Sequence, residues 1–113
     1  MMKYVLTVLF LFIGALSCAQ PKAVLNETSY NFWLSEPANT DVPTPLIVFL
    51  HGKSLSGTDI NRVKKYGALK GVEKGLNIPA YLVAPQLPFG PWDAKKVDEI
   101  VSYMIKTYNI DES

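Results

Sequence analysis

Short apolar runs alternate with stretches of helical spacing along much of this chain, and this alternation restricts the fold more than any other feature. Residues 46–50 and 81–84 are too short for buried helices and are rich in strand formers. Apolar residues recur near helical spacing over 60–72 and again over 97–108. The order predicts an α/β fold with a mostly parallel sheet and flanking helices, in which 46–50 is a central strand covered on both faces.

The chain ahead of this alternating region divides into three further segments. Residues 30–34 form an aromatic run that predicts another strand, and 36–45 hold three prolines and predict a surface loop. Residues 20–27 are polar and are interpreted as a short tether. We therefore expect one domain over residues 28–113.

The first nineteen residues have the pattern of a targeting segment. Lys3 precedes an apolar run over 4–16, and small residues follow at 17–19. Thirteen residues of helix rise about 20 Å, less than the ~30 Å of a bilayer core, so export is favoured over a permanent transmembrane helix. The protein is accordingly expected to be periplasmic, secreted or an outer-membrane lipoprotein.

Two cleavage chemistries compete at the end of this segment. Ordinary signal peptidase would cut before Gln20 and remove Cys18, whereas a lipobox reading makes Cys18 the acylated first residue of a lipoprotein, with Ala15 where a leucine is usual. The mature chain holds no cysteine pair in either case, so we expect no disulfide, no metal and no other cofactor. The formal charge of +1 argues against nucleic acid as a partner, and contact with a membrane is expected only through a lipid anchor.

Function is expected just after residues 46–50, since ligands of a parallel sheet bind beyond the carboxyl ends of its strands. A phosphate-binding loop would need glycine where Ile47 stands, and a nucleophile elbow would need glycine where Ser56 stands. An oxyanion-hole loop is the third interpretation. There Gly52 permits the turn and a close approach, while the N–H of Lys53, and with it that of Ser54, faces a developing negative charge. The fourth interpretation is a plain turn that ends the strand and has no catalytic role.

Two stretches carry a family resemblance. The sequences PLIVFLHGKSLSG (45–57) and YLVAPQLPFGPWD (81–93), the second followed by an amphipathic helix, resemble α/β-hydrolases, and in particular bacterial secreted esterases of the phospholipase/carboxylesterase and predicted-peptidase kind. The resemblance covers roughly residues 28–113. It implies that Gly52 and Lys53 form the oxyanion-hole loop through the backbone and that Trp92 lies near the acyl pocket. Trp92 reads equally well as a residue that covers the core at a helix start.

The resemblance also implies a catalytic serine, an acidic residue and a histidine, and these triad residues are absent from the chain. We therefore expect an incomplete α/β-hydrolase fold, inactive alone, belonging to a serine-type hydrolase of small ester or peptide substrates. The rival interpretation is a non-catalytic exported module that binds a glycan or a protein through Tyr30, Trp33 and Trp92.

Overall fold

The computed structural model describes residues 20–113, and its centre is a mixed four-stranded sheet in the order β1-β2-β4-β3. The strands are β1 (Lys22–Val24), β2 (Phe32–Ser35), β3 (Leu46–Val48) and β4 (Tyr81–Pro85). Only β3 and β4 run parallel, whereas β2 is antiparallel to both β1 and β4. The α/β class is confirmed, but the prediction of a mostly parallel sheet is wrong. The predicted leader, including Cys18, lies outside the described residues.

The segment predicted as a tether contributes to this sheet. Lys22 to Val24 pair with β2 in antiparallel register, and Val24 is buried in the core. The tether prediction for residues 20–27 is therefore wrong at β1. The strand has no clear apolar pattern in the sequence, because β1 is an edge strand and two of its three residues are exposed.

The most buried strand is β4. All five of its residues are buried, because β2 and β3 flank it and helical layers cover both faces. Within residues 20–113, β3 instead forms an edge of the sheet, and the Ile47 side chain is 42% exposed. The expectation that residues 46–50 form a central strand covered on both faces is thus wrong for the described part of the chain.

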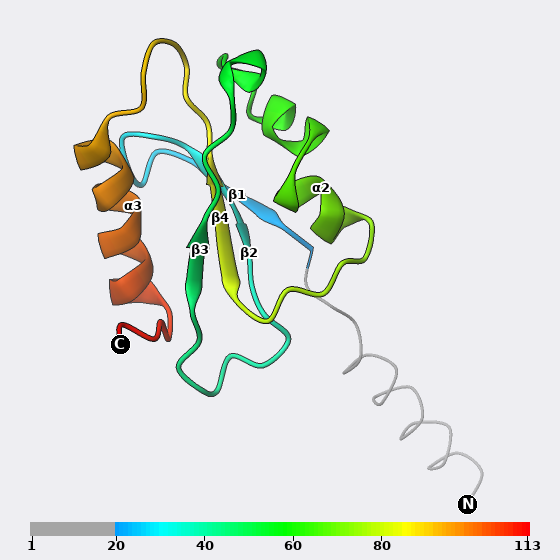
Figure 1. The fold of residues 1–113 in the computed structure, drawn as a ribbon. Helices are drawn as coiled ribbons and strands as arrows, with labels where there is room; N and C mark the ends of the chain where they lie inside the picture. Colours follow the sequence, from blue (N-terminus) through cyan, green and yellow to red (C-terminus); the bar gives the residue numbers. More distant parts are fainter. Residues whose placement is uncertain (1–19) are drawn as a thin grey trace, which may run out of the picture.

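Two helical layers enclose the sheet (Figure 1). On one face lies α3 (Ala94–Thr107), which begins at its N-cap Asp93 and buries Ile100 and Met104 against β2 and β4. On the other face lie the 3₁₀ helices η1 (Lys53–Leu55) and η2 (Ile60–Lys65) and the short helix α2 (Ala68–Glu73). Val63 and Leu69 from this layer pack near β2. No helix among residues 20–113 is long and apolar enough to cross a membrane.

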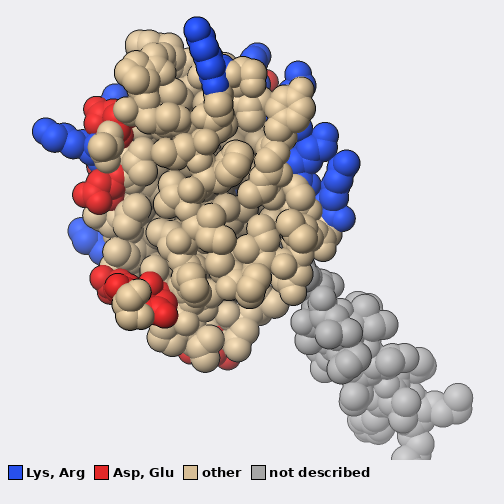
Figure 2. Space-filling model, viewed as in Figure 1, with Lys and Arg blue, Asp and Glu red and all other residues tan. Residues whose placement is uncertain are grey.

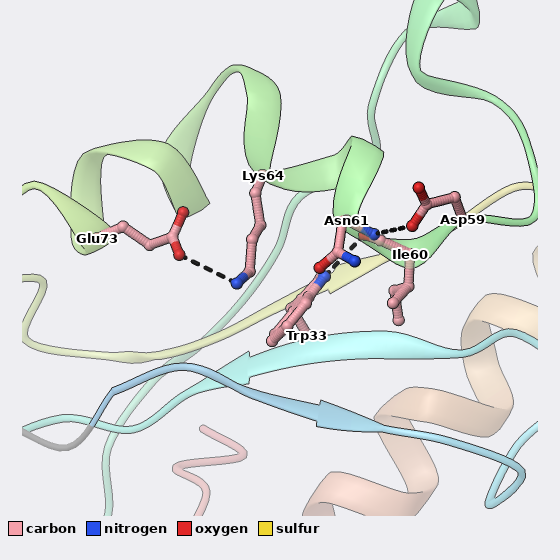
Figure 3. A network of polar contacts seen from close by, with 6 residues as sticks. All are labelled: Trp33, Asp59, Ile60, Asn61, Lys64 and Glu73. Atoms are coloured by element: carbon pink, nitrogen blue, oxygen red, sulfur yellow. Dashed lines mark hydrogen bonds and ion pairs between the residues drawn. The ribbon is translucent and has the colours of Figure 1, made fainter.

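Polar contacts fix the second layer to the sheet (Figure 3). The indole N–H of Trp33 donates to the Ile60 carbonyl at 2.8 Å, and the Lys64 ammonium lies 4.0 Å above the Trp33 ring. The same ammonium pairs with Glu73 at 3.1 Å, and Asp59 caps η2 through its carboxylate. These contacts join β2, η2 and α2.

The last residues of the chain return to the edge of the sheet. Thr44 accepts from Asp111 N–H at 2.9 Å and donates its own N–H to Asn109 at 3.0 Å, in a parallel bridge between Thr44 and Ile110. On the other side, the Pro45 carbonyl accepts the N–H of Tyr81 in β4. Because backbone groups of successive strand residues face opposite sides, those of Thr44 face away from β4. Residues 109–111 therefore lie beside the edge of β3 that faces away from β4.

Candidate active-site cleft

Two loops meet at one end of the sheet (Figure 1). Because β3 and β4 are parallel, their carboxyl ends lie together, and residues 51–57 and 86–92 follow them directly. The two loops line an open cleft of about 650 Å³, formed by residues 51–53, Ser56 and residues 87–92. The three residues singled out from the sequence, Gly52, Lys53 and Trp92, all line this cleft.

His51 joins the two loops through its ring and its backbone. Its side chain is buried, and Nε2 accepts the backbone N–H of Leu87 at 3.0 Å. Nδ1 lies 2.7 Å from the Gly52 carbonyl, so the proton is assigned to Nδ1, which donates there. The backbone carbonyl of His51 accepts the indole N–H of Trp92 at 3.2 Å. Both ring nitrogens are thus engaged in holding the loops, and neither is available as a base.

Further contacts join the same loops beyond His51. Gly57 N–H donates to the Leu87 carbonyl at 3.1 Å, and the Gln86 side-chain amide donates to the Leu55 carbonyl at 3.4 Å. The loop after β3 is therefore bonded to the loop after β4 near its start, its middle and its end. Such a loop can present its remaining N–H groups in a fixed direction.

Gly52 does not use the freedom that the sequence argument gave it. Its φ of −80° and ψ of 175° are extended values that any residue adopts, and a Cβ added there would meet no atom within 4 Å. The explanation of Gly52 as the residue that permits the turn is therefore wrong. Lys53 and Ser54 begin η1, and at a helix start the first N–H groups have no partner within the turn.

Trp92 has a structural role that the sequence did not reveal. Besides its bond to His51, its ring packs edge-on against the rings of Tyr30 and His51, with centroids 5.3 Å and 5.0 Å away. The Tyr30 hydroxyl in turn accepts the N–H of Asp93, the residue that caps α3. Trp92 thus lines the cleft and also packs against the core at the start of α3. Its contact with an acyl group stays a prediction.

The cleft holds few groups able to do chemistry. Its lining offers one hydroxyl, that of Ser56, one fully engaged imidazole and one ammonium, that of Lys53, and no carboxylate from the described residues. Residues 20–113 also contain no cluster of three or more His, Cys, Asp or Glu side chains suited to hold a metal. These groups can orient and stabilise a ligand, but they do not form a nucleophile, base and acid set.

Sequence reasoning missed Phe89, which lies between Leu87 and Trp92 on the cleft wall and is 84% exposed. The only signal was a phenylalanine inside a Pro-Phe-Gly-Pro segment, where a turn places its residues at the surface.

Comparison with known proteins bears on the fold of this chain. No family model matches the chain, and no curated protein matches it. A solved structure described as a thermostable esterase matches with a TM-score of 0.54 and 26% sequence identity, over 81% of this chain and 31% of that one. The chain therefore spans less than a third of the length of that esterase. The similarity supports an esterase-like hydrolase fold for this chain.

Proposed function

We propose that this chain forms the front part of an exported serine-type carboxylic ester hydrolase, in which the Gly52–Lys53 loop supplies the oxyanion hole. The observation that carries the proposal is the set of hydrogen bonds from the loop after β4 that fixes residues 51–57 beside an open cleft. The similarity to a thermostable esterase supports the hydrolase-like fold on which the proposal depends.

The proposed chemistry depends on preorganised backbone donors. When a serine attacks an ester carbonyl, negative charge develops on the carbonyl oxygen, and donors already in place stabilise it without reorganising. In the proposal, Lys53 N–H, and with it Ser54 N–H, donates to that oxygen, and Trp92 lies beside the acyl group. His51 keeps the loop in position and takes no part in proton transfer.

The nucleophile is proposed to lie on a further strand beside β3. Residues 109–111 already run parallel to the chain at Thr44, along the edge of β3 that faces away from β4. Continued in the same direction, such a strand would end at the same side of the sheet as the cleft, because β3 and its neighbour would be parallel. Export through residues 1–19, with Cys18 either removed or acylated, belongs to the same proposal.

The rival function, glycan or protein binding by three aromatic residues, has less support. Tyr30 and Trp33 are buried, and Trp33 lies beneath Lys64 and does not line the cleft. Only Trp92 of the three lines the cleft.

One substitution tests the oxyanion role directly. Lys53→Pro removes the backbone N–H, and the site accepts proline because residue 53 is the first of η1 and Gly52 before it is extended. In a form of the protein extended through the coding sequence after Ser113, kcat for a p-nitrophenyl ester should fall about 10²- to 10³-fold, the usual loss for one such donor.

Lys53→Ala is the matched control, because it removes the side chain and keeps the N–H. Its kcat should stay within a few-fold of the unsubstituted enzyme. Equal losses in the two variants would assign the effect to the ammonium group and would contradict the backbone role.

A further inference from the structure

Phe89 is the most exposed large hydrophobic side chain among residues 20–113. It is 84% exposed and belongs to neither hydrophobic cluster of the described core. Its ring lies on the wall of the candidate cleft, where it borders the same opening as Lys53 and Trp92. A single exposed hydrophobic side chain is ordinary on a protein surface, but this ring lies in the wall of a cleft, and clefts that bind ligands are lined mainly by apolar and aromatic side chains.

The backbone around Phe89 restricts this exposed position. Pro88 and Pro91 each fix their own φ, and Gly90 has φ of +72°, a value that other residues rarely adopt. A ring carried on a restricted loop loses less conformational freedom when it binds a ligand than one on a flexible segment. Phe89 therefore has the features of a preorganised contact.

The polar groups of the cleft indicate what kind of ligand would lie against this ring. Sugar recognition needs several side chains that bond hydroxyl groups, but the lining offers only Ser56 and Lys53, since both nitrogens of His51 are engaged. The remaining surface is apolar, from Leu87 to Trp92. Lys53 is the one charged side chain that residues 20–113 contribute to the lining, so it favours a negative group at that side of the cleft.

We propose that Phe89 and Trp92 form the wall that binds an aromatic acyl group, with the carboxylate of the acid product beside the Lys53 ammonium. The inference rests on the proposed ester hydrolase function and names its substrate class as esters of aromatic carboxylic acids. In this proposal Phe89 determines specificity. Trp92 contacts the aromatic ring of the acyl group and also holds His51 through its indole hydrogen bond.

The test uses the chain itself, with phenylacetate as the probe. In two-dimensional ¹⁵N NMR spectra the indole N–H signal of Trp92 should shift during the titration. The indole signal of Trp33, which is bonded to Ile60 and lies outside the cleft lining, should stay in place and report an intact fold. Phe89→Ser should weaken binding about tenfold, the effect of covering part of one aromatic ring.

Matched variants separate the contributions. Val42→Ser removes a 50% exposed apolar side chain that lies outside the cleft and should leave the affinity unchanged. Lys53→Met should abolish the preference for phenylacetate over its neutral amide.

Three results would overturn the inference: no binding of phenylacetate, unchanged affinity in Phe89→Ser, or equally tight binding of methyl glucoside. None of them depends on ester turnover, which tests the proposed function separately through the Lys53 variants.

Discussion

The bond from the Trp92 indole to the His51 carbonyl is expected to control how often the loop over residues 51–57 opens. Trp92→Phe removes that donor at 3.2 Å, while a phenyl ring can keep edge-on contacts with Tyr30 and His51. His51 is only 3% exposed, so its carbonyl would lose its partner in a nearly buried place. Leaving such an acceptor unpaired costs about 1–3 kcal/mol.

This cost predicts a measurable change in amide exchange. Gly57 N–H and Leu87 N–H both bond across the two loops, so their protection reports loop opening. A lower opening free energy of that size predicts exchange about 5- to 150-fold faster at these two amides in Trp92→Phe. Hydrogen exchange followed by NMR measures each amide separately.

Trp33→Phe is the matched control, because it removes the other indole hydrogen bond, which anchors η2 to β2. Its effect should appear in η2 and not at the two loops. Unchanged exchange at Gly57 and Leu87 in Trp92→Phe would refute the reasoning, and so would an equal acceleration in both variants.

Two further predictions concern the scaffold. Gly67→Ala should destabilise the fold by more than the about 1–3 kcal/mol that φ of +83° alone costs, because the new Cβ would clash with the Phe49 ring. Gly75→Ala, at φ of +101° with open space around it, should show the backbone cost only, and equal urea midpoints for the two variants would contradict this. The side-chain and backbone hydrogen bonds of Ser29 lower the pKa of Glu99. This carboxylate therefore stabilises the fold at pH values above its ordinary pKa, and the contribution is lost as pH falls through the lowered pKa. Ser29→Ala should raise the Glu99 pKa toward its ordinary value in a ¹³C NMR titration, and an unchanged pKa would contradict the assignment.

The sequence predicted which segments form regular structure better than it predicted their neighbours. The helix expected from residue 93 onward is α3, Ala94–Thr107, because a long amphipathic pattern with an Asp N-cap is a strong local signal. The run at 46–50 is a strand as expected, at β3, but it lies at the edge of the described sheet. An apolar run predicts that a segment is buried, but it does not predict which element covers it.

Strand direction was the main error in the fold. Nothing local distinguishes a strand that pairs parallel from one that pairs antiparallel, and β2 is antiparallel to both of its neighbours. Alternation of strands and helices predicted the parallel pair of β3 and β4 correctly. The same alternation carries no information on the direction of β2, because β2 precedes the first helix.

Within the candidate site, the sequence predicted three residues that lie along one cleft, but it did not predict the bonds that hold them. Gly52, Lys53 and Trp92 were expected near a ligand and do line one cleft. The contacts that hold them join groups thirty or more residues apart in the sequence, as in the bond from Leu87 N–H to the His51 ring. Pairings of this kind follow from tertiary structure, so no motif records them.

Figure 2 shows a broad face without charged side chains at its centre, and Lys, Arg, Asp and Glu lie mainly toward the sides. Figure 1, seen from the same direction, places β3 on this face. Ile47 and Leu50 are exposed apolar residues on or next to β3. An uncharged, partly apolar strand edge accepts another strand readily, which agrees with the proposed position of the nucleophile strand and predicts aggregation when the edge stays open.

The most direct test of the central claim is hydrolysis of a short-chain p-nitrophenyl ester by two proteins, the chain as it stands and a form extended through the coding sequence after Ser113. The account predicts turnover by the extended protein alone, and loss of that turnover in Lys53→Pro. Turnover by the shorter chain, abolished by Ser54→Ala, would contradict it and would place the nucleophile in the loop that we assign to the oxyanion hole.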